Sequence, residues 1–202
     1  MMYQQIVIGI DQSYDNTGIS ISADGKLLDI KSVELKKLKS NTQRRWTLIR
    51  RLNSLLKQCT EKSSNIICIV ERARIHGGDS SFININAIKA MGALTAVIVD
   101  QCAIYDVPVY SVDTRTWKAA VVGTSKPKQN KCGVSPHKWP TVKWVCKQGF
   151  EHKILIPVST RKIKGTFVRN GIRYRYDDDK ADSAGISMFW WLGDKNKLQL
   201  EK

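Results

Sequence analysis

The chain has 202 residues and carries 33 Lys or Arg against 18 Asp or Glu, which gives a formal net charge of +15. With 42% hydrophobic and 25% charged residues, the composition is that of a folded protein and excludes a disordered basic tail. The length suits a single domain over residues 1–202, because two domains would be tight. The positive charge favours a polyanionic partner, nucleic acid before an anionic membrane surface, over a plain solubility surface.

No apolar run of the chain reaches the ~18 residues that a membrane span needs, so we expect no membrane partner. The apolar run near the N-terminus has no basic region before it and ends at Asp11, which predicts a strand and not a signal peptide. We therefore expect a cytoplasmic protein, of a bacterial cell or a phage-infected host, with five free cysteines: Cys59, Cys68, Cys102, Cys132 and Cys146.

The order of apolar segments predicts an α/β fold with a mixed sheet. Three antiparallel strands come first, over residues 4–11, 18–22 and 26–35, with Asp24-Gly25 as a hairpin turn. Helices and strands then alternate, which indicates parallel pairing: helix 42–61, strand 66–71, helix 82–104, strand 107–112 and helix 114–121, capped by Asp113 or Thr114. The buried face of the first helix should hold Trp46, Ile49, Leu52, Leu56 and Cys59.

Residues 124–176 differ in composition from the rest of the chain. They hold four prolines, and thirteen Lys or Arg against one acid, Glu151, so we interpret them as a basic insertion. Asn170-Gly171 predicts a β-hairpin with a type I′ turn, with Phe167, Ile172, Tyr174 and Tyr176 on one face and Val168, Arg173 and Arg175 on the other. Residues 177–192 then predict a capped helix whose apolar face includes Met188, Trp191 and Leu192.

Acids stand at three places where packing alone explains them poorly. Asp11 ends one apolar strand, and Glu71 ends a second apolar run, IICIV. Asp179 and Asp182 are three residues apart at the start of a helix, so their side chains share one side. Since central strands of one sheet end close together, and a terminal helix can pack beside them, these acids are expected to converge.

Each acid also has an ordinary structural explanation. Asp11 could be a turn residue, and Glu71 could pair with Arg72 or Arg74. The three consecutive acids at 177–179 could simply favour the positive end of the helix dipole.

Carboxylates that converge repel one another and raise one another's pKa unless a cation neutralises them. Oxygen ligands alone suit Mg²⁺ or Mn²⁺. Two such ions about 4 Å apart can activate water and stabilise the leaving oxygen of a phosphodiester. A basic protein with such a cluster is interpreted as a metal-dependent nuclease.

Four segments carry these acids in order: IGIDQSYDNTGISI, IVERARIHGGDSSFININAIKAMGAL, VPVYSVDTRTWKAAVVG and DDDKADSAGIS. The first holds Asp11, Gln12, Ser13, Thr17 and Gly18. Together the segments resemble the RuvC family of Holliday-junction resolvases, which have an RNase H-like fold. The resemblance covers residues 6–123 and 177–192.

The resemblance implies a homodimer with two active sites, which suits a four-way junction because two strands are nicked as a pair. Each site would bind two Mg²⁺, with Mn²⁺ as a substitute, through Asp11, Glu71, Asp179 and Asp182. Asp178 is the alternative to Asp179, and the spacing to Asp182 favours Asp179. Lys118 matches a family lysine near the scissile phosphate, and a solvated helix lysine is the alternative.

Two departures from the family pattern concern DNA binding. Arg74 stands where several members carry an aromatic residue, and residues 124–176 are longer than in compact members. We expect DNA contacts from Arg72, Arg74, Lys118, Lys126, Lys128, Lys164, Arg169, Arg173 and Arg175, with Phe167 and Tyr174 stacking on bases. The alternative is an ordinary hairpin with its aromatic residues packed inward.

The resulting hypothesis is a crossover junction endonuclease. The alternatives are a nuclease that prefers forks, flaps or R-loops, a non-catalytic junction-binding protein, and an actin-like kinase lobe, for which the chain is too short. Zinc binding by Cys132, His137, Cys146 and His152 is disfavoured because their spacing fits no common finger. His76 is interpreted either as part of a loop or as a phosphate or water contact.

Overall fold

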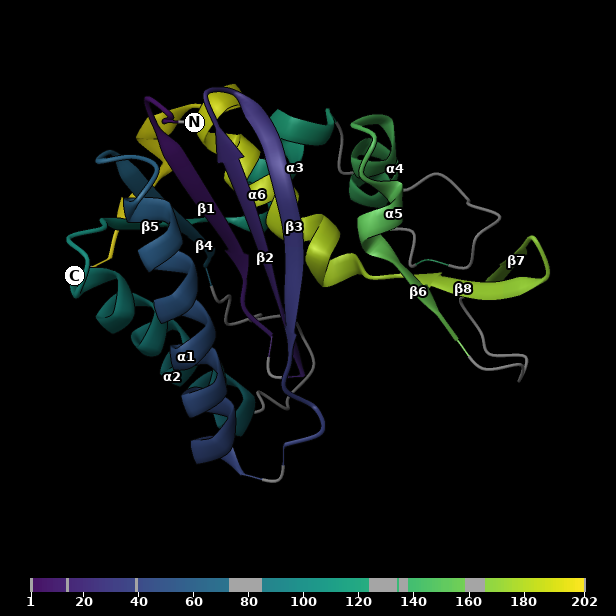
Figure 1. Cartoon of the computed structure of the whole chain (residues 1–202), viewed down its shortest axis with the longest axis horizontal. Coiled ribbons are helices and arrows are strands. Elements are labelled where there is room, and N and C mark those ends of the chain that lie inside the picture. The colour runs from purple at the N-terminus through teal and green to yellow at the C-terminus, as the bar shows by residue number, and fades with distance from the viewer. Residues whose placement is uncertain are drawn as a thin grey trace.

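The computed structural model describes residues 2–13, 15–38, 40–72, 85–123, 134, 138–158 and 166–201 (Figure 1). Its main sheet has six strands in the order β3-β2-β1-β4-β5-β9. The strands are β1 (Ile6–Asp11), β2 (Asn16–Ala23), β3 (Lys26–Glu34), β4 (Ile66–Glu71), β5 (Val109–Val112) and β9 (Gln199–Leu200). The first three pair antiparallel, and β1, β4 and β5 pair parallel, so the predicted mixed α/β sheet is confirmed.

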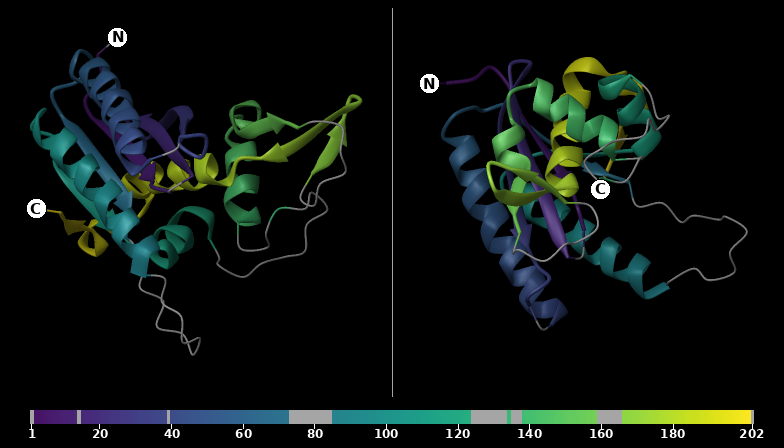
Figure 2. Two further views of the ribbon diagram at one scale, coloured as in Figure 1. Left: turned by 90° about the horizontal axis from the view of Figure 1, so that it is seen from below. Right: turned by 90° about the vertical axis from the view of Figure 1, so that its right-hand side faces the viewer.

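Helices cover both faces of this sheet (Figure 2). Helices α1 (Asn41–Thr60) and α2 (Ile85–Ala103) lie on one face, and α3 (Thr114–Val122) and α6 (Asp178–Leu192) lie on the other. Successive side chains of β1 point to opposite faces of the sheet, so they pack against the helices on both faces. Ile6, Ile8 and Ile10 pack in the cluster that contains α1 and α2, and Val7 packs with α3 and α6.

Helix α6 packs against the backbone of β1 and β2 because glycines lie beneath it. A Cβ atom on Gly9 would lie closer than 3.0 Å to backbone atoms of Ser183 and Ser187, and one on Gly18 would collide with the backbone of Asp179. The hydroxyl of Ser20 donates to the Ser183 carbonyl at 2.6 Å. The N-terminal half of α6 is therefore held directly over the ends of β1 and β2.

Both predicted tight turns are confirmed. Asp24 and Gly25 have φ of 47° and 80°, and Asn170 and Gly171 have φ of 49° and 75°. Two successive residues with positive φ are the signature of a type I′ hairpin turn. The second turn joins β7 (Phe167–Arg169) to β8 (Ile172–Tyr176), which form a three-stranded sheet with β6 (Leu155–Pro157).

Part of the segment 124–176 packs against the main fold. It contains α4 (Trp139–Lys147) and α5 (Glu151–Ile154), neither of which was predicted from the sequence. Val142 and Val145 of α4 and Ile154 of α5 are fully buried in one cluster with Ala181 and Ala184 of α6. These helices therefore belong to the core layer around α6, whereas the β7–β8 hairpin extends beyond it (Figure 1).

Two predictions about helix faces are wrong. Trp46 is 58% exposed, because the buried stripe of α1 runs through Leu48, Leu52, Leu55, Leu56 and Cys59, on the other side of the helix. Leu192 is 54% exposed, because it is the last residue of α6, where the neighbouring Trp190 and Trp191 make the packing contacts instead.

No helix in the described part of the chain is long and apolar enough to cross a membrane. Cys59, Cys68 and Cys102 are free thiols, and Cys132 lies outside the described residues. The thiols of Cys59, Cys68 and Cys102 are buried in the core between α1, α2 and the sheet. Burial raises the pKa of Cys59 to about 11, so this thiol stays protonated and unreactive at neutral pH.

The close approach of α6 predicts opposite effects for two glycine substitutions. We expect Gly9→Ala to lower the free energy of unfolding by about 2–3 kcal/mol, because the added methyl group must push α6 off the sheet. Gly92→Ala, on an open face of α2, should raise it by about 0.5–1 kcal/mol through helix propensity. Urea titration of both variants checks the pair, and a Gly9→Ala protein as stable as the parent would contradict the packing described.

Candidate active site

Two of the acids stand side by side at one edge of the sheet. Asp11 is the last residue of β1, and Glu71 is the last residue of β4. These strands are parallel, and Ile10 of β1 pairs with Val70 of β4, so the two acids follow at the same level. The expected convergence of strand ends therefore holds for this pair.

Helix α6 supplies the other two acids. Asp177 is the N-cap residue, and its side chain accepts a hydrogen bond from the N–H of Lys180 at 3.2 Å. The capping role thus falls to Asp177, while Asp179 and Asp182 face the sheet edge, where both act electrostatically on Asp11. The helix-dipole explanation therefore accounts for Asp177 and leaves the other two without a capping function.

Burial and mutual repulsion raise the pKa of three of these carboxyls. The pKa of Asp11 lies well above its usual value because of burial, then because of the charges of Asp182, Glu71 and Asp179. Burial, followed by the charge of Asp178, raises the pKa of Asp179 to about 6. Burial also raises the pKa of Asp182, although nearby lysines oppose it. The carboxylates of the site therefore carry more negative charge than the nearby lysine side chains neutralise.

Glu71 is fixed by helix α3. Its Oε1 accepts a hydrogen bond from the hydroxyl of Thr114 at 2.6 Å, and its Oε2 accepts one from the indole N–H of Trp117 at 3.0 Å. Trp117 is fully buried, so α3 holds this carboxylate rigidly. The expected alternative partner, Arg72, instead donates from Nε to the Ser111 hydroxyl at 3.4 Å.

Two lysines lie among the acids. The Nζ of Lys118 is 3.2 Å from Oδ2 of Asp182, and both side chains are nearly buried, so Lys118 is not a solvated helix lysine. Lys138, at the start of α4, forms an ion pair with Asp178, and its Nζ is 3.8 Å from Oδ1 of Asp179. Burial lowers the pKa of Lys138, but the hydrogen bond and charge of Asp178, then the other acids, raise it above its usual value.

The acid cluster fits a divalent cation in its chemistry. Its donors are carboxylate oxygens, and Oδ1 of Asp182 is buried without a hydrogen-bond partner among the described residues. The side chains as placed do not form a finished coordination shell. Within the described ranges, no three His, Cys, Asp or Glu side chains lie close enough to share one ion. Glu71, Asp179 and Asp182 instead accept hydrogen bonds from Thr114, Asn16 and Lys118, respectively.

The hairpin carries the remaining described residues that we expected at the DNA. Arg173 and Arg175 lie on the face opposite the aromatic residues, as predicted, and Arg169 pairs with Glu151 at 3.1 Å. The ring of Phe167 stacks on that of Tyr176 at 5.0 Å and lies 6.2 Å from that of Tyr174. The aromatic rings therefore pack on one another, which favours the inward-packed alternative over base stacking.

Several predicted residues lie outside the described part of the chain: Arg74, His76, Lys126, Lys128, Cys132, His137 and Lys164. Other residues of the site were missed from the sequence. Asn16 donates to Asp179 Oδ2 at 3.2 Å, and Lys138 was counted only as general basic charge. The sequence did contain one signal that Lys138 is unusual. Lys138 directly precedes Trp139-Pro140, which is a typical helix start, and the helix dipole disfavours a cation at that position.

The repulsion at Asp11 predicts a pH-dependent gain in stability on its removal. A native carboxyl with a raised pKa destabilises the fold as pH rises from about 4, the unfolded value, through its native pKa. In EDTA, Asp11→Asn should therefore raise the free energy of unfolding at pH 8 by about 1–2 kcal/mol, and by much less at pH 4. Thermal unfolding at both pH values checks this, with Asp100→Asn, at an exposed position of α2, as control. An equal gain at both pH values would contradict the electrostatic origin.

Comparisons with known proteins place the fold. No family model matches the chain, and no curated protein matches it. Among solved structures, RuvC of Thermus thermophilus is 14% identical, with a TM-score of 0.58 over 97% of this chain and 99% of that one. RuvC of T. thermophilus in complex with a Holliday junction substrate is 13% identical, with a TM-score of 0.60 over 98% and 100%. The yeast mitochondrial Holliday junction resolvase Ydc2 is 16% identical, with a TM-score of 0.48 over 94% and 79%. The similarity to RuvC over the whole length confirms the RNase H-like fold expected for this chain.

Proposed function

We propose that the protein is a metal-dependent, structure-selective endonuclease that resolves Holliday junctions by paired nicks. The observation that carries the proposal is the acid cluster, which comes from the ends of β1 and β4 and the start of α6. The fold shared with a RuvC structure in complex with a Holliday junction substrate supports branched DNA as the substrate. Two copies of the chain would act together, because a symmetric junction needs two matched cuts.

We infer that Mg²⁺, or Mn²⁺ in its place, is held by the four carboxylates of Asp11, Glu71, Asp179 and Asp182. When bound, the ions supply activation of a water molecule and stabilisation of the oxygen that leaves the phosphodiester. The excess negative charge of the cluster supports this inference, since a cation would relieve the repulsion that raises the pKa of Asp11.

The protein's own groups would orient the acids and the phosphate. Thr114 and Trp117 fix both oxygens of Glu71, so this carboxylate keeps one orientation. Lys118 holds Asp182 and places an ammonium group at the site, where a phosphate oxygen can accept a hydrogen bond from it. Lys138 supplies a second cation from α4, on the side of Asp178 and Asp179.

The central test is cleavage of a synthetic four-way junction. We expect symmetric nicks in Mg²⁺, none in EDTA, and a loss of at least about 100-fold in rate for Asp182→Asn, because the buried carboxylate is a proposed ligand. Asp178→Asn is the matched control on the same helix and should stay within about tenfold of the parent, since Asp178 faces Lys138.

Substrates run in parallel separate the alternatives. Forks, flaps, R-loops and linear duplex should be cut more slowly than the junction. Faster cleavage of one of these branched forms would favour the alternative nuclease, and equal cleavage of linear duplex would contradict structure selectivity. Junction binding without cleavage in either metal would indicate a non-catalytic binding protein.

The basic hairpin predicts a change in salt dependence. Arg173→Ala combined with Arg175→Ala should weaken junction binding and reduce the slope of log K against log salt by up to about 2, one phosphate contact each. Lys195→Ala with Lys197→Ala removes the same charge near the C-terminus, away from the hairpin in Figure 1, and should leave the slope unchanged. Binding titrations at several salt concentrations check this, and an unchanged slope for the hairpin variant would assign the two arginines a structural role only.

A further inference from the structure

A cavity follows the free edge of the main sheet. Strand β3 is the first strand of that sheet and pairs with β2 alone among the described residues. A cavity of about 590 Å³ is lined by five consecutive β3 residues, 29–33. Because alternate side chains of a strand point to opposite faces, a cavity that touches five in a row must run along the strand edge. At such an edge, the outward backbone N–H and C=O groups are available for pairing, except that the N–H of Ile30 already donates to Oδ1 of Asp29 at 2.9 Å.

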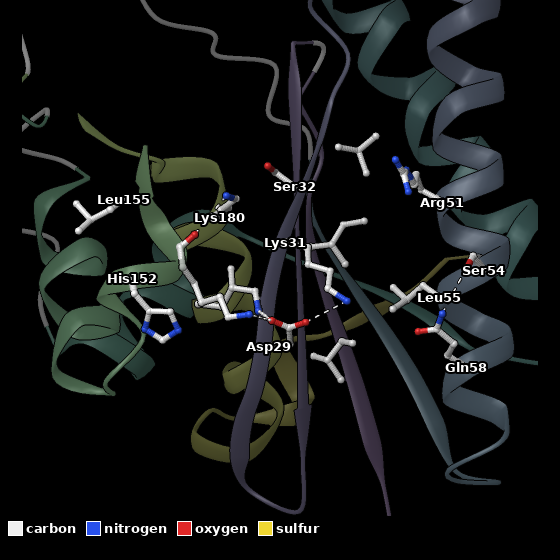
Figure 3. Close-up of a pocket in the computed structure, with 15 residues that line it drawn as sticks. Asp29, Lys31, Ser32, Arg51, Ser54, Leu55, Gln58, His152, Leu155 and Lys180 are labelled. Carbon is white, nitrogen blue, oxygen red and sulfur yellow. Dashed lines mark hydrogen bonds and ion pairs between the residues drawn. The ribbon is translucent and has the colours of Figure 1, made fainter. Parts of the chain in front are cut away.

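Structural elements from both layers form the walls of this cavity (Figure 3). Helix α1 lies on one side with Arg51, Ser54, Leu55 and Gln58. On the other side lie His152 and Lys153 of α5, Leu155 of β6 and Lys180 of α6. The β3 edge therefore forms the bottom of a groove, which we call the β3 groove, between α1 and the α5–β6 segment.

The β3 groove is apolar at its base and positive at its rim. The apolar lining residues are Ile19, Ile21, Ile30, Val33, Leu55 and Leu155. The charged ones are Lys31, Arg51, Lys153 and Lys180, against a single carboxylate, Asp29. Asp29 is already paired, with Lys31 and Lys153 each at 3.0 Å. Lys180 is paired in turn with Asp177 at 3.6 Å. The positive charge left for an occupant therefore comes from Arg51 and from the two lysines that share Asp29.

We propose that the β3 groove binds an extended, acidic segment of a partner protein, which pairs with β3 as an additional strand. The strand edge would supply backbone hydrogen bonds, the apolar base would take alternate side chains, and the basic rim would take carboxylates. A DNA backbone is the less suitable occupant, because it has no use for an open strand edge or an apolar base. This inference stands apart from the proposed nuclease function, since it uses none of the four acids.

The first test uses a defined probe peptide. A fluorescent seven-residue peptide with alternating Glu and Val is titrated with the full-length protein, and fluorescence anisotropy is measured. We expect saturable binding, and binding at least about tenfold weaker for the Lys and Val counterpart, because the rim is positive. No saturation at millimolar protein, or equal binding of both peptides, would overturn the proposal.

N-methylation of the peptide tests the added strand directly. In a strand that pairs through one edge, only every second N–H faces the neighbour. Methylating one alternate set of peptide amides should therefore abolish binding, while methylating the other set should change the Kd less than about threefold. Equal loss from both sets, or from neither, would show that the peptide does not pair with a strand.

Two adjacent arginines of α1 give a matched pair of protein variants. Arg51 lines the β3 groove, and Arg50, also exposed, does not. Arg51→Glu should raise the peptide Kd about tenfold, and Arg50→Glu less than twofold, with the same unfolding temperature for both. Equal effects of the two variants would overturn the proposal. Displacement of the peptide by linear duplex, weakened equally by Arg51→Glu, would instead assign the groove to DNA.

Discussion

The short distance between α6 and the backbone of β1 and β2 determines how close the acids of α6 lie to Asp11. Gly9 and Gly18 leave no side chain between the helix and the strands, and Ser20 hydrogen-bonds to the helix backbone. The first turns of α6 are therefore pressed onto the strand ends, where Asp11 stands. A larger residue at either glycine would lift the helix and separate the acids that the two layers bring together. The packing of small residues in the core is thus also the means by which carboxylates from distant segments are held close.

The rest of the site responds to the repulsion that this packing creates. Asp182 is 5% exposed and depends on Lys118 for its counter-charge. Glu71 depends on neutral donors from α3, which orient a carboxylate without cancelling its charge. Some acids have a lysine as partner and others have only neutral donors. The cluster therefore keeps a net negative charge inside a protein whose net charge is +15. The negative potential of the acids would stabilise a cation bound there. A phosphate would be attracted only by the two lysines of the site, Lys118 and Lys138.

The sequence predicted the mixed sheet, with antiparallel strands first and parallel strands later, and the acids at its edge, because each depends on local signals. Apolar strands that end in an acid, and the spacing of Asp179 and Asp182, are visible without a structure. What it did not predict depends on tertiary contacts. Helix α4 is nine residues long and lies in a proline-rich segment, so its periodicity was too short to recognise, and the position of Lys138 beside Asp178 was lost with it. Trp46 was misplaced because an apolar side chain at helical spacing was taken as buried, whereas the leucine stripe faces the sheet.

The basic segment 124–176 therefore has more than one physical role. Its thirteen Lys or Arg first suggested a single surface for a polyanion. In the structure, Lys138 turns inward to the acids, Lys153 pairs with Asp29 at the β3 edge, and Arg169 pairs with Glu151. Cations committed to such pairs contribute less to long-range attraction, because each is offset by a carboxylate within a few ångströms. Attraction of DNA by the described part of the segment thus depends most on side chains that have no acid beside them. Arg173 and Arg175 form no ion pair among the described residues, because they point to the face of β8 opposite Tyr176, whose hydroxyl donates to Glu151.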